Sequence, residues 1–156
     1  MAVTLKIGDK APDFKVLDQD GNTVKLSSLK GQKSVIFFYP ADMTPTCTTE
    51  ACNLRDNHAY FQSKGYEVYG VSPDDVKSHQ KFIKKHELPY TLLSDTDKKM
   101  AMAYGVWDEK QLFGRKYMGI LRTTFVLDKK GIIENIITNV KSKEHAAQIL
   151  IPVSLD

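Results

Sequence analysis

The amino-acid sequence predicts an α/β sandwich in which helices cover a central mixed sheet. Its most apolar run, Val35 to Tyr39, has no polar member, which is typical of a central strand covered on both faces. From this run onward, segments with strand and helix patterns alternate, and the chain closes with two adjacent strands and a helix. This order predicts layers of helix packed on a sheet of mixed strand directions.

Length and composition predict one globular domain over residues 1–156. The chain of 156 residues is long enough to bury a sizeable core, and 42% apolar with 26% charged residues is ordinary for a soluble protein. A net charge of +3, spread without a basic stripe, argues against a nucleic-acid partner. We see no long apolar run and no charged-then-apolar leader, so we expect no membrane segment and a cytoplasmic location.

Turn residues define the N-terminal elements. Residues 1–14 read as an extended arm. Within residues 15–26, Asp20-Gly21 supplies the positive φ of a tight turn, so we expect a β-hairpin that extends the sheet. Residues 27–30 fit one helical turn, ended by Gly31.

A long helix is predicted from Pro45 to Lys64. Thr44 is a suitable N-cap, Pro45 fits the first helical position, and Gly65 provides a stop. One face carries a stripe with alternating steps of four and three residues, typical of a buried helix side: Cys47, Ala51, Leu54, His58 and Phe61. We expect Cys47 to be partly shielded, His58 to be a core histidine with its hydrogen bonds satisfied, and Cys52 to lie nearer the helix margin.

The remaining elements follow in order. We expect strands at 66–71, 91–93, 123–127 and 132–138, with a turn at 128–131 joining the last two. We expect helices from the Ser72-Pro73 start to about 86, over 97–104, and from a Ser142 cap to about 150. Residues 108–119 show no clear period and read as a loop, with room for a strand near Tyr117.

The position of Cys47 favours a reactive sulfur. It falls in the first helical turn, where free N–H groups and the positive end of the helix dipole favour an anion, and the thiolate is the nucleophilic form of cysteine. A thiol with the ordinary pKa of about 8.5 is only about 3% thiolate at pH 7. The dipole contributes about 0.3–1 kcal/mol, whereas one pKa unit equals about 1.36 kcal/mol. A mostly ionised sulfur therefore needs a nearby cation or further donors.

The spacing to Cys52 limits what the two thiols can do. Five residues along an ideal helix give about 7.5 Å of rise and about 140° of rotation, which places the Cα atoms about 8.7 Å apart. A disulfide requires about 4.4–6.8 Å. Either Cys47 and Cys52 never pair, or pairing requires the start of the helix to unwind.

These residues resemble a known family, the peroxiredoxins. The resemblance rests on the pattern Pro40-x-x-x-Thr44-x-x-Cys47, with Glu50 close by and Arg122 far downstream. Cys52, five residues after Cys47, is similar to the peroxiredoxin Q subfamily, also called bacterioferritin comigratory protein. The likeness extends over nearly the whole chain through short motifs in the family's order: Gly-Asp-Lys-Ala-Pro-Asp-Phe (8–14), Gly-Val-Ser (70–72), Leu-Leu-Ser-Asp (92–95), Tyr-Gly-Val-Trp (104–107) and Arg-Thr-Thr-Phe-Val-Leu-Asp (122–128). Thr46 departs from the subfamily's more usual glycine.

The resemblance implies a thioredoxin-like fold with an N-terminal β-hairpin extension, and a thioredoxin-dependent peroxidase. It implies that Cys47 reduces hydrogen peroxide and organic hydroperoxides and becomes a sulfenic acid, and that Cys52 then forms an intramolecular disulfide with it. Thioredoxin or a glutaredoxin would restore the thiols, and the subfamily is usually monomeric. It assigns Thr44 and Arg122 to the peroxide pocket. It implies that Glu50 orients Arg122, and we expect Pro40 to end the strand and shield the sulfur.

Other readings stay open at this level. Cys47 could be a small core residue, Arg122 a surface charge, and Glu50 an ordinary acid of a first helical turn. The two cysteines also permit a non-enzymatic redox sensor. A general disulfide oxidoreductase is disfavoured, because such enzymes place Cys-x-x-Cys at the helix start and this chain has Cys-x-x-x-x-Cys. No cofactor or metal is expected, since the chain has no Gly-rich phosphate loop and no histidine at ligand spacing from the cysteines.

Overall fold

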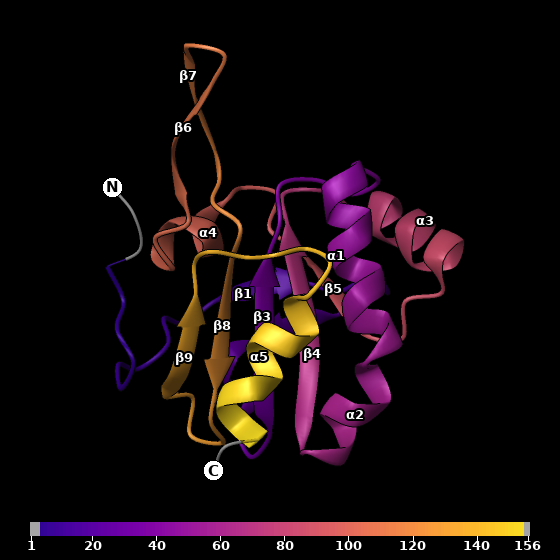
Figure 1. The fold of residues 1–156 in the computed structure, drawn as a ribbon, viewed down its shortest axis with the longest axis vertical. Helices are drawn as coiled ribbons and strands as arrows, with labels where there is room; N and C mark the ends of the chain where they lie inside the picture. Colours follow the sequence, from indigo (N-terminus) through magenta and orange to yellow (C-terminus); the bar gives the residue numbers. More distant parts are fainter. Residues whose placement is uncertain (1–3, 155–156) are drawn as a thin grey trace.

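The structure, a computed structural model, describes residues 4–154 and has a seven-stranded central sheet with the order β2-β1-β5-β4-β3-β8-β9 (Figure 1). The strands of this sheet are β1 (Lys15–Leu17), β2 (Thr23–Lys25), β3 (Lys33–Phe38), β4 (Tyr66–Ser72), β5 (Thr91–Ser94), β8 (Thr123–Leu127) and β9 (Ile133–Ile137). The three strands β3, β4 and β5 are parallel neighbours, whereas the outer pairs are antiparallel. The predicted mixed sheet is therefore confirmed.

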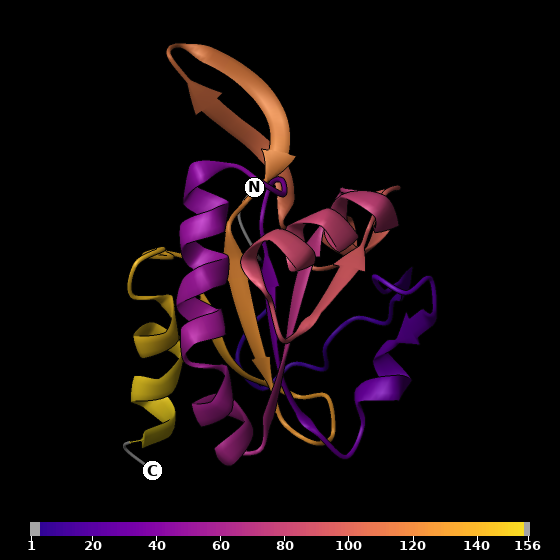
Figure 2. The same cartoon turned by 90° about the vertical axis from the view of Figure 1, so that its right-hand side faces the viewer.

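Helices cover both faces of this sheet. They are η1 (Leu26–Leu29, a 3-10 helix), α1 (Pro45–Asp56), α2 (His58–Ser63), α3 (Val76–His86), α4 (Lys99–Ala103) and α5 (His145–Ser154). Strand β3 alternates between two cores, because Val35 and Phe37 pack with α1, α2, α3 and α5, and Ile36 and Phe38 pack with η1 and α4. Figure 2 shows α1 and α5 side by side on one face. The Val35–Tyr39 run is buried on both sides, as predicted.

Gly70 in β4 allows the core residues between α1 and the sheet to pack closely. A Cβ on Gly70 would lie 2.7 Å from a Leu92 methyl carbon and 2.8 Å from the Phe37 ring, so no larger residue fits without movement. The Phe37 ring stacks on Tyr39 at 5.5 Å and meets Tyr90 edge-on at 5.7 Å. The Tyr90 hydroxyl donates to a backbone carbonyl of α1 at 2.7 Å, so this aromatic layer supports the helix.

The N-terminal expectations are confirmed. Residues 15–17 and 23–25 form the predicted antiparallel hairpin, and the predicted helical turn is η1. The arm before them is tied to the C-terminal hairpin, since Lys10 bridges Ile132 and Gly8 N–H donates to the Ile133 carbonyl at 2.8 Å. Residues 1–3 of the predicted arm lie outside the described residues.

The predicted helix over 45–64 is wrong in one respect, because it is two helices. Asn57 has φ −111° and ψ 8°, outside the helical range, and ends α1. Its side-chain amide donates to the Asn53 carbonyl at 2.8 Å, and its own N–H bonds to the Leu54 carbonyl at 3.2 Å. Asparagine competes in this way with regular helical bonds, which explains a break in the middle of an otherwise continuous apolar stripe.

Three helix starts differ from the prediction. Ser72 does not cap α3; its hydroxyl donates to Asp74, and Asp75 is the cap, accepting from Ser78 N–H at 2.8 Å. Helix α4 begins at Lys99, whose N–H donates to Asp97, and the next two N–H groups donate to the Asp95 carboxylate. Helix α5 begins at His145, three residues after the predicted Ser142 cap.

Residues 108–119, predicted as a loop with room for a strand near Tyr117, form a β-hairpin instead, and Tyr117 does lie in its second strand. Strands β6 (Trp107–Leu112) and β7 (Arg115–Ile120) pair antiparallel around a turn in which Phe113 and Gly114 both have positive φ, 51° and 77°. The hairpin projects from the body in Figures 1 and 2, and the Phe113 side chain is 96% exposed. Much of it faces water on both sides, so the alternation that marks a half-buried strand is absent from the sequence.

No helix in the described part of the chain is both long and apolar enough to span a bilayer.

Candidate active site

The site begins where β3 ends. The chain leaves the sheet after Phe38, passes through a loop in which Met43 adopts a left-handed backbone with φ 67°, and enters α1. Thr44 is extended and its hydroxyl oxygen accepts from Cys47 N–H at 3.4 Å, so the predicted N-cap is confirmed. The same hydroxyl donates to the Ala41 carbonyl at 3.3 Å. Pro45 occupies the first helical position, as predicted.

Cys47 is buried at the head of the predicted stripe. Its exposed fraction is 2%, and the other four stripe residues are buried as well. Cys52 is half-buried, both thiols are free, and both lie within the intact α1. Pro40 is half-buried beside the end of β3. For His58 the expectation is wrong in part: the ring is buried, but its Nε2 has no hydrogen-bond partner among residues 4–154.

Arg122 connects the sulfur to a carboxylate. It directly precedes β8, whose first residue pairs with Phe38 at the end of β3, so the fold brings Arg122 to the head of α1. One guanidinium nitrogen, Nη2, lies 3.2 Å from Cys47 Sγ, and Nη1 donates to Glu50 Oε1 at 2.7 Å. Burial lowers the pKa of Arg122, but the contact with Cys47 and the charge of Glu50 outweigh it and raise the pKa overall. Three predicted residues thus meet in one cluster.

Glu50 is an unusual member of this cluster. Its side chain is fully buried, and its Oε2 receives no hydrogen bond from any described residue. Burial raises the pKa of Glu50 to about 7, although the adjacent Arg122 charge opposes this shift. The nearest recorded group to Oε2 is Nε2 of His145, at 3.3 Å.

Sequence reasoning missed His145 and Thr124. His145 is the first residue of α5, its Nδ1 lies 3.0 Å from Gln148 Oε1, and its Nε2 lies 2.6 Å from Thr124 Oγ1. Burial lowers the pKa of His145 to about 4. No motif could have found this contact, because it depends on α5 packing against α1 across the end of β8.

A second buried pair, also missed, anchors the loop before Thr44. Asp42 accepts from the Tyr39 hydroxyl at 2.5 Å and the Ser78 hydroxyl at 2.7 Å, and its Oδ2 lies 2.8 Å from His79 Nδ1. With Asp74, this pair could hold a metal ion by distance alone. Asp74 Oδ2, however, already accepts from Asp42 N–H and the Ser72 hydroxyl, both at 2.7 Å. The set reads as a hydrogen-bonded anchor of the loop.

A further cation reaches the site from the hairpin. Lys110 in β6 donates to the Ile120 carbonyl at 3.0 Å. Burial and the charge of Arg122 lower the pKa of Lys110 below its ordinary value, although the nearby Cys47 opposes this shift. Sequence reasoning missed Lys110 because it lies in the segment predicted as a loop.

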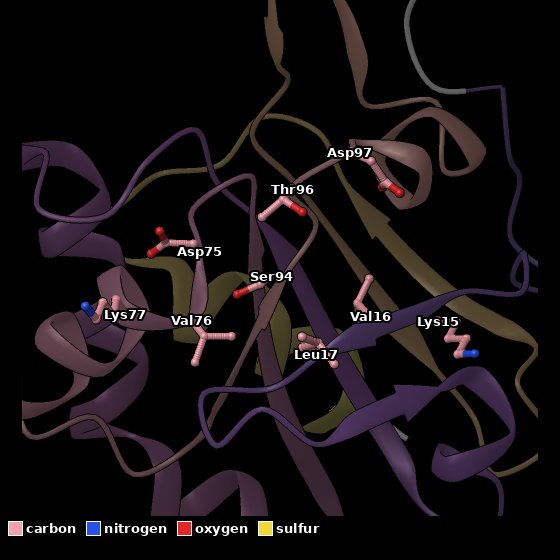
Figure 3. A pocket seen from close by; sticks show the side chains of 9 residues that line it. All are labelled: Lys15, Val16, Leu17, Asp75, Val76, Lys77, Ser94, Thr96 and Asp97. Carbon is pink, nitrogen blue, oxygen red and sulfur yellow. The ribbon is translucent and has the colours of Figure 1, made fainter.

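Cys52 faces a different environment. It lines an open hollow of about 400 Å³ together with Thr48, Thr49, Asn53, Asp56 and Lys143. Beside it, the Asn53 amide donates to the Lys143 carbonyl at 2.9 Å and accepts from Ala146 N–H at 2.8 Å, which joins α1 to the start of α5. Another hollow of about 440 Å³ lies at β1, β5 and the start of α3, and none of the predicted site residues lines it (Figure 3).

Comparison with known proteins identifies the family. The model of the AhpC/TSA family matches residues 7–136. The chain is 49% identical to Peroxiredoxin Bcp of Bacillus subtilis over 148 residues, covering 95% of this chain and 94% of that one. It is 42% identical to Peroxiredoxin Bcp of Escherichia coli over 146 residues, covering 94% of each.

Solved structures agree with these relatives. Peroxiredoxin Q of Xanthomonas campestris matches with a TM-score of 0.87 and 33% identity, covering 98% of this chain and 97% of that one. Peroxidoxin BcpB of Mycobacterium tuberculosis matches with a TM-score of 0.85 and 36% identity, covering 97% of each. The thioredoxin-like fold implied by the sequence is confirmed. The chain therefore belongs to the AhpC/TSA family, as a peroxiredoxin of the peroxiredoxin Q (bacterioferritin comigratory protein) type, and such proteins are thiol peroxidases.

Proposed function

We propose that this peroxiredoxin reduces hydrogen peroxide and organic hydroperoxides through the thiolate of Cys47. The observation that carries the proposal is the position of Arg122, 3.2 Å from Cys47 Sγ and 2.7 Å from Glu50 Oε1. A positive charge at this distance favours the ionised form of the Cys47 thiol. Arg122 is therefore the nearby cation that a mostly ionised sulfur needs in addition to the helix dipole. A related protein from Xanthomonas campestris is described by its alkyl peroxide reduction activity.

In the first step the thiolate attacks the terminal oxygen of the hydroperoxide. A sulfur–oxygen bond forms, the oxygen–oxygen bond breaks, and the leaving alkoxide or hydroxide takes up a proton to give alcohol or water. Arg122, the Thr44 hydroxyl and local N–H groups stabilise the charge that develops on the two oxygens. The Thr44 proton turns from the Ala41 carbonyl to the substrate, while its oxygen keeps accepting from Cys47 N–H. Pro40 shields the sulfur from water.

In the second step the Cys47 sulfenic acid condenses with the Cys52 thiol to give a disulfide and one water. Because both residues lie in α1, the helix start must unwind first. Local bonding supports this direction of opening. The Thr44 cap is long at 3.4 Å, whereas Tyr90 holds the Ala51 carbonyl and Asn53 is joined to α5. Residues before Ala51 would unwind while the rest of α1, including Cys52, stays in place.

An external dithiol, thioredoxin or a glutaredoxin, then restores both thiols by exchange. The open hollow beside Cys52 gives the reductant access to that sulfur. We propose a monomeric enzyme in the cytoplasm, where reducing systems of this kind keep thiols reduced.

Replacing each cysteine tests the proposal. Cys47→Ser should abolish peroxide consumption, whereas Cys52→Ser should permit one oxidation of Cys47 and then stall with thioredoxin. Intact mass measurement of the wild type after one equivalent of peroxide should show loss of two protons without added oxygen. Undiminished peroxide consumption by Cys47→Ser would rule the mechanism out. Disulfide formation without turnover, under every reducing system tried, would favour the redox sensor, and insulin reduction would favour a general oxidoreductase.

A further inference from the structure

Glu50 presents a buried oxygen that lacks a donor. Oε1 accepts from Arg122, but Oε2 receives no hydrogen bond from any described residue, although the side chain is fully buried. A buried carboxylate oxygen without a donor disfavours the ionised form of the group. Oε2 therefore needs either a donor or a proton of its own.

The neighbouring His145 is arranged to accept and not to donate. Gln148 Oε1 accepts from Lys141 N–H at 2.8 Å, and the Gln148 amide donates to the Asn139 carbonyl at 2.8 Å, which fixes the orientation of that side chain. Nδ1 of His145 must then carry the proton that it donates to Gln148 Oε1. In a neutral ring, Nε2 keeps a single lone pair, which accepts from the Thr124 hydroxyl at 2.6 Å, so the ring has no N–H to offer Glu50 Oε2, 3.3 Å away.

The protonation state of Glu50 decides how much of the Arg122 charge acts on Cys47. Arg122 supplies one positive charge to two acids, Cys47 and Glu50. If Glu50 is ionised, its carboxylate neutralises much of that charge and, as a like charge, opposes a thiolate nearby. If Glu50 is protonated, the charge of Arg122 is available to the sulfur.

We propose that Glu50 carries a proton on Oε2 in the reduced enzyme near neutral pH, because His145 presents no N–H to this oxygen, and that His145 thereby leaves the charge of Arg122 to Cys47. His145 is then a positioning residue for the peroxidase reaction. The inference rests on the proposed role of Cys47 as a thiolate nucleophile. It agrees with the burial that raises the pKa of Glu50 to about 7 and lowers that of His145 to about 4.

Other charged or titratable groups also face this cluster. Tyr90, on the segment between α3 and β5, senses the charge of Glu50, and burial keeps its pKa well above the ordinary value. Lys110 in β6 senses both Arg122 and Cys47. Neither donates a hydrogen bond to Oε2, which has no donor among the described residues.

Infrared spectroscopy tests the proton directly in reduced wild-type protein. Among the described residues Glu50 is the fully buried glutamate, and comparison with Glu50→Gln assigns to it a protonated carboxyl band seen with carbon-13-labelled glutamate at pH 6. We expect this band at pH 6 and its loss in Glu50→Gln. Absence of the band in the wild type overturns the proposal. The measurement uses no peroxide, so its result is independent of whether Cys47 proves to be the nucleophile.

Thiolate absorbance against pH tests the effect on Cys47. In His145→Gln the new amide can donate to Oε2 and stabilise the Glu50 carboxylate, so the midpoint should rise by about one pH unit, a tenfold loss of thiolate at lower pH. Adding Glu50→Gln to this variant should return the midpoint toward the wild-type value, which a merely structural defect would not do. His58→Gln, which alters another buried histidine, at the start of α2 and beside Tyr90, is the control and should leave the midpoint in place. An unmoved midpoint in folded His145→Gln, or no return in the double variant, overturns the proposal.

Discussion

Two buried acid–histidine pairs flank the Cys47 site, and they differ in how well the acid is satisfied. Asp42 and His79 have side chains that are 1% and 0% exposed, and Glu50 and His145 are both fully buried. Asp42 accepts from two hydroxyl groups and faces His79, so both of its oxygens are used. Glu50 has Arg122 on one oxygen and no donor, within the described residues, on the other.

The difference shows how one combination of residues serves two purposes. Both ring nitrogens of His79 lie within hydrogen-bonding distance of oxygens, Asp42 Oδ2 at 2.8 Å and the Leu93 carbonyl at 3.0 Å, and these contacts lock the loop before Thr44. His145 has a fixed donor on one side and a lone pair on the other. The satisfied pair holds the backbone in place, and the unsatisfied pair leaves one Glu50 oxygen, beside the Cys47 site, without a donor among the described residues.

The largest expected effect comes from breaking the satisfied pair. Asp42→Asn removes the charge that His79 faces and should lower the free energy of unfolding by about 3 kcal/mol, because it leaves a buried ionisable group unpaired. Urea unfolding measures this value. Asp56→Asn, with 64% of the side chain exposed, is the matched control and should change it by no more than about 0.5 kcal/mol. A loss below about 1 kcal/mol would mean that the two pairs do not differ as described.

The next largest effect is a pH dependence of stability that we expect from the Glu50–His145 pair. The pKa of Glu50 is raised from 4.5 to about 7, so between these values the folded state keeps a proton that the unfolded chain has lost. The Glu50 contribution to stability is therefore present below about pH 4.5 and lost as the pH rises through about 7. Glu50→Gln removes this loss, and its unfolding free energy relative to the wild type should increase from pH 4.5 to 7. Glu144→Gln, at an exposed site, should show no such trend; a flat difference for Glu50→Gln would contradict the raised pKa.

The link between α1 and α5 gives a smaller effect. Asn53→Ala removes two hydrogen bonds, to the Lys143 carbonyl and from Ala146 N–H, and should cost about 1–2 kcal/mol. Because the link positions the start of α5, it should also weaken the contact of His145 with Glu50 and shift the thiolate titration. Thr49→Ala, whose hydroxyl donates within α1, is the control for unfolding and titration. A stability loss with no shift in titration would separate this link from the Glu50 pair.

The smallest expected effect comes from removing the Thr44 cap. It tests whether the loop held by Asp42 can fix the start of α1 when the cap is absent. Thr44→Val removes the oxygen that accepts from Cys47 N–H and should cost about 1 kcal/mol, while Thr44→Ser keeps the cap. Hydrogen exchange at the Cys47 amide should become about fivefold faster in the valine variant. Equal exchange in both variants would show that Asp42 alone fixes the start of α1.

Local patterns predicted much of this molecule. Repeated spacing along α1 identified the buried side with Cys47 at its head, and the apolar run of β3 identified the centre of the sheet. The resemblance led to Arg122, whose position beside the sulfur depends on β8 pairing with β3. Each of these features is encoded within a few residues or by a motif of known order.

The missed features depend on contacts between distant segments. Asp42 meets His79, and Glu50 meets His145, only after the helices pack on the sheet, and no spacing in the chain records either contact. The hairpin over 107–120 was missed because its strands are largely exposed and lack a buried face. The break at Asn57 was missed because the apolar stripe continues through it.

The closeness of α1 to the sheet has one further consequence. A methyl group on Gly70 would collide with Phe37 and Leu92, so the absence of a side chain there lets the Phe37 ring pack close to β4. Phe37 in turn contacts Tyr90, which holds the Ala51 carbonyl. A larger residue at position 70 would push the Phe37 ring, and with it Tyr90 and α1, away from the sheet. This movement would increase the distance between the Cys47 sulfur and the guanidinium of Arg122, which directly precedes β8. The distance between the Arg122 charge and the Cys47 sulfur thus depends on Gly70, a residue without a side chain that contacts neither of them.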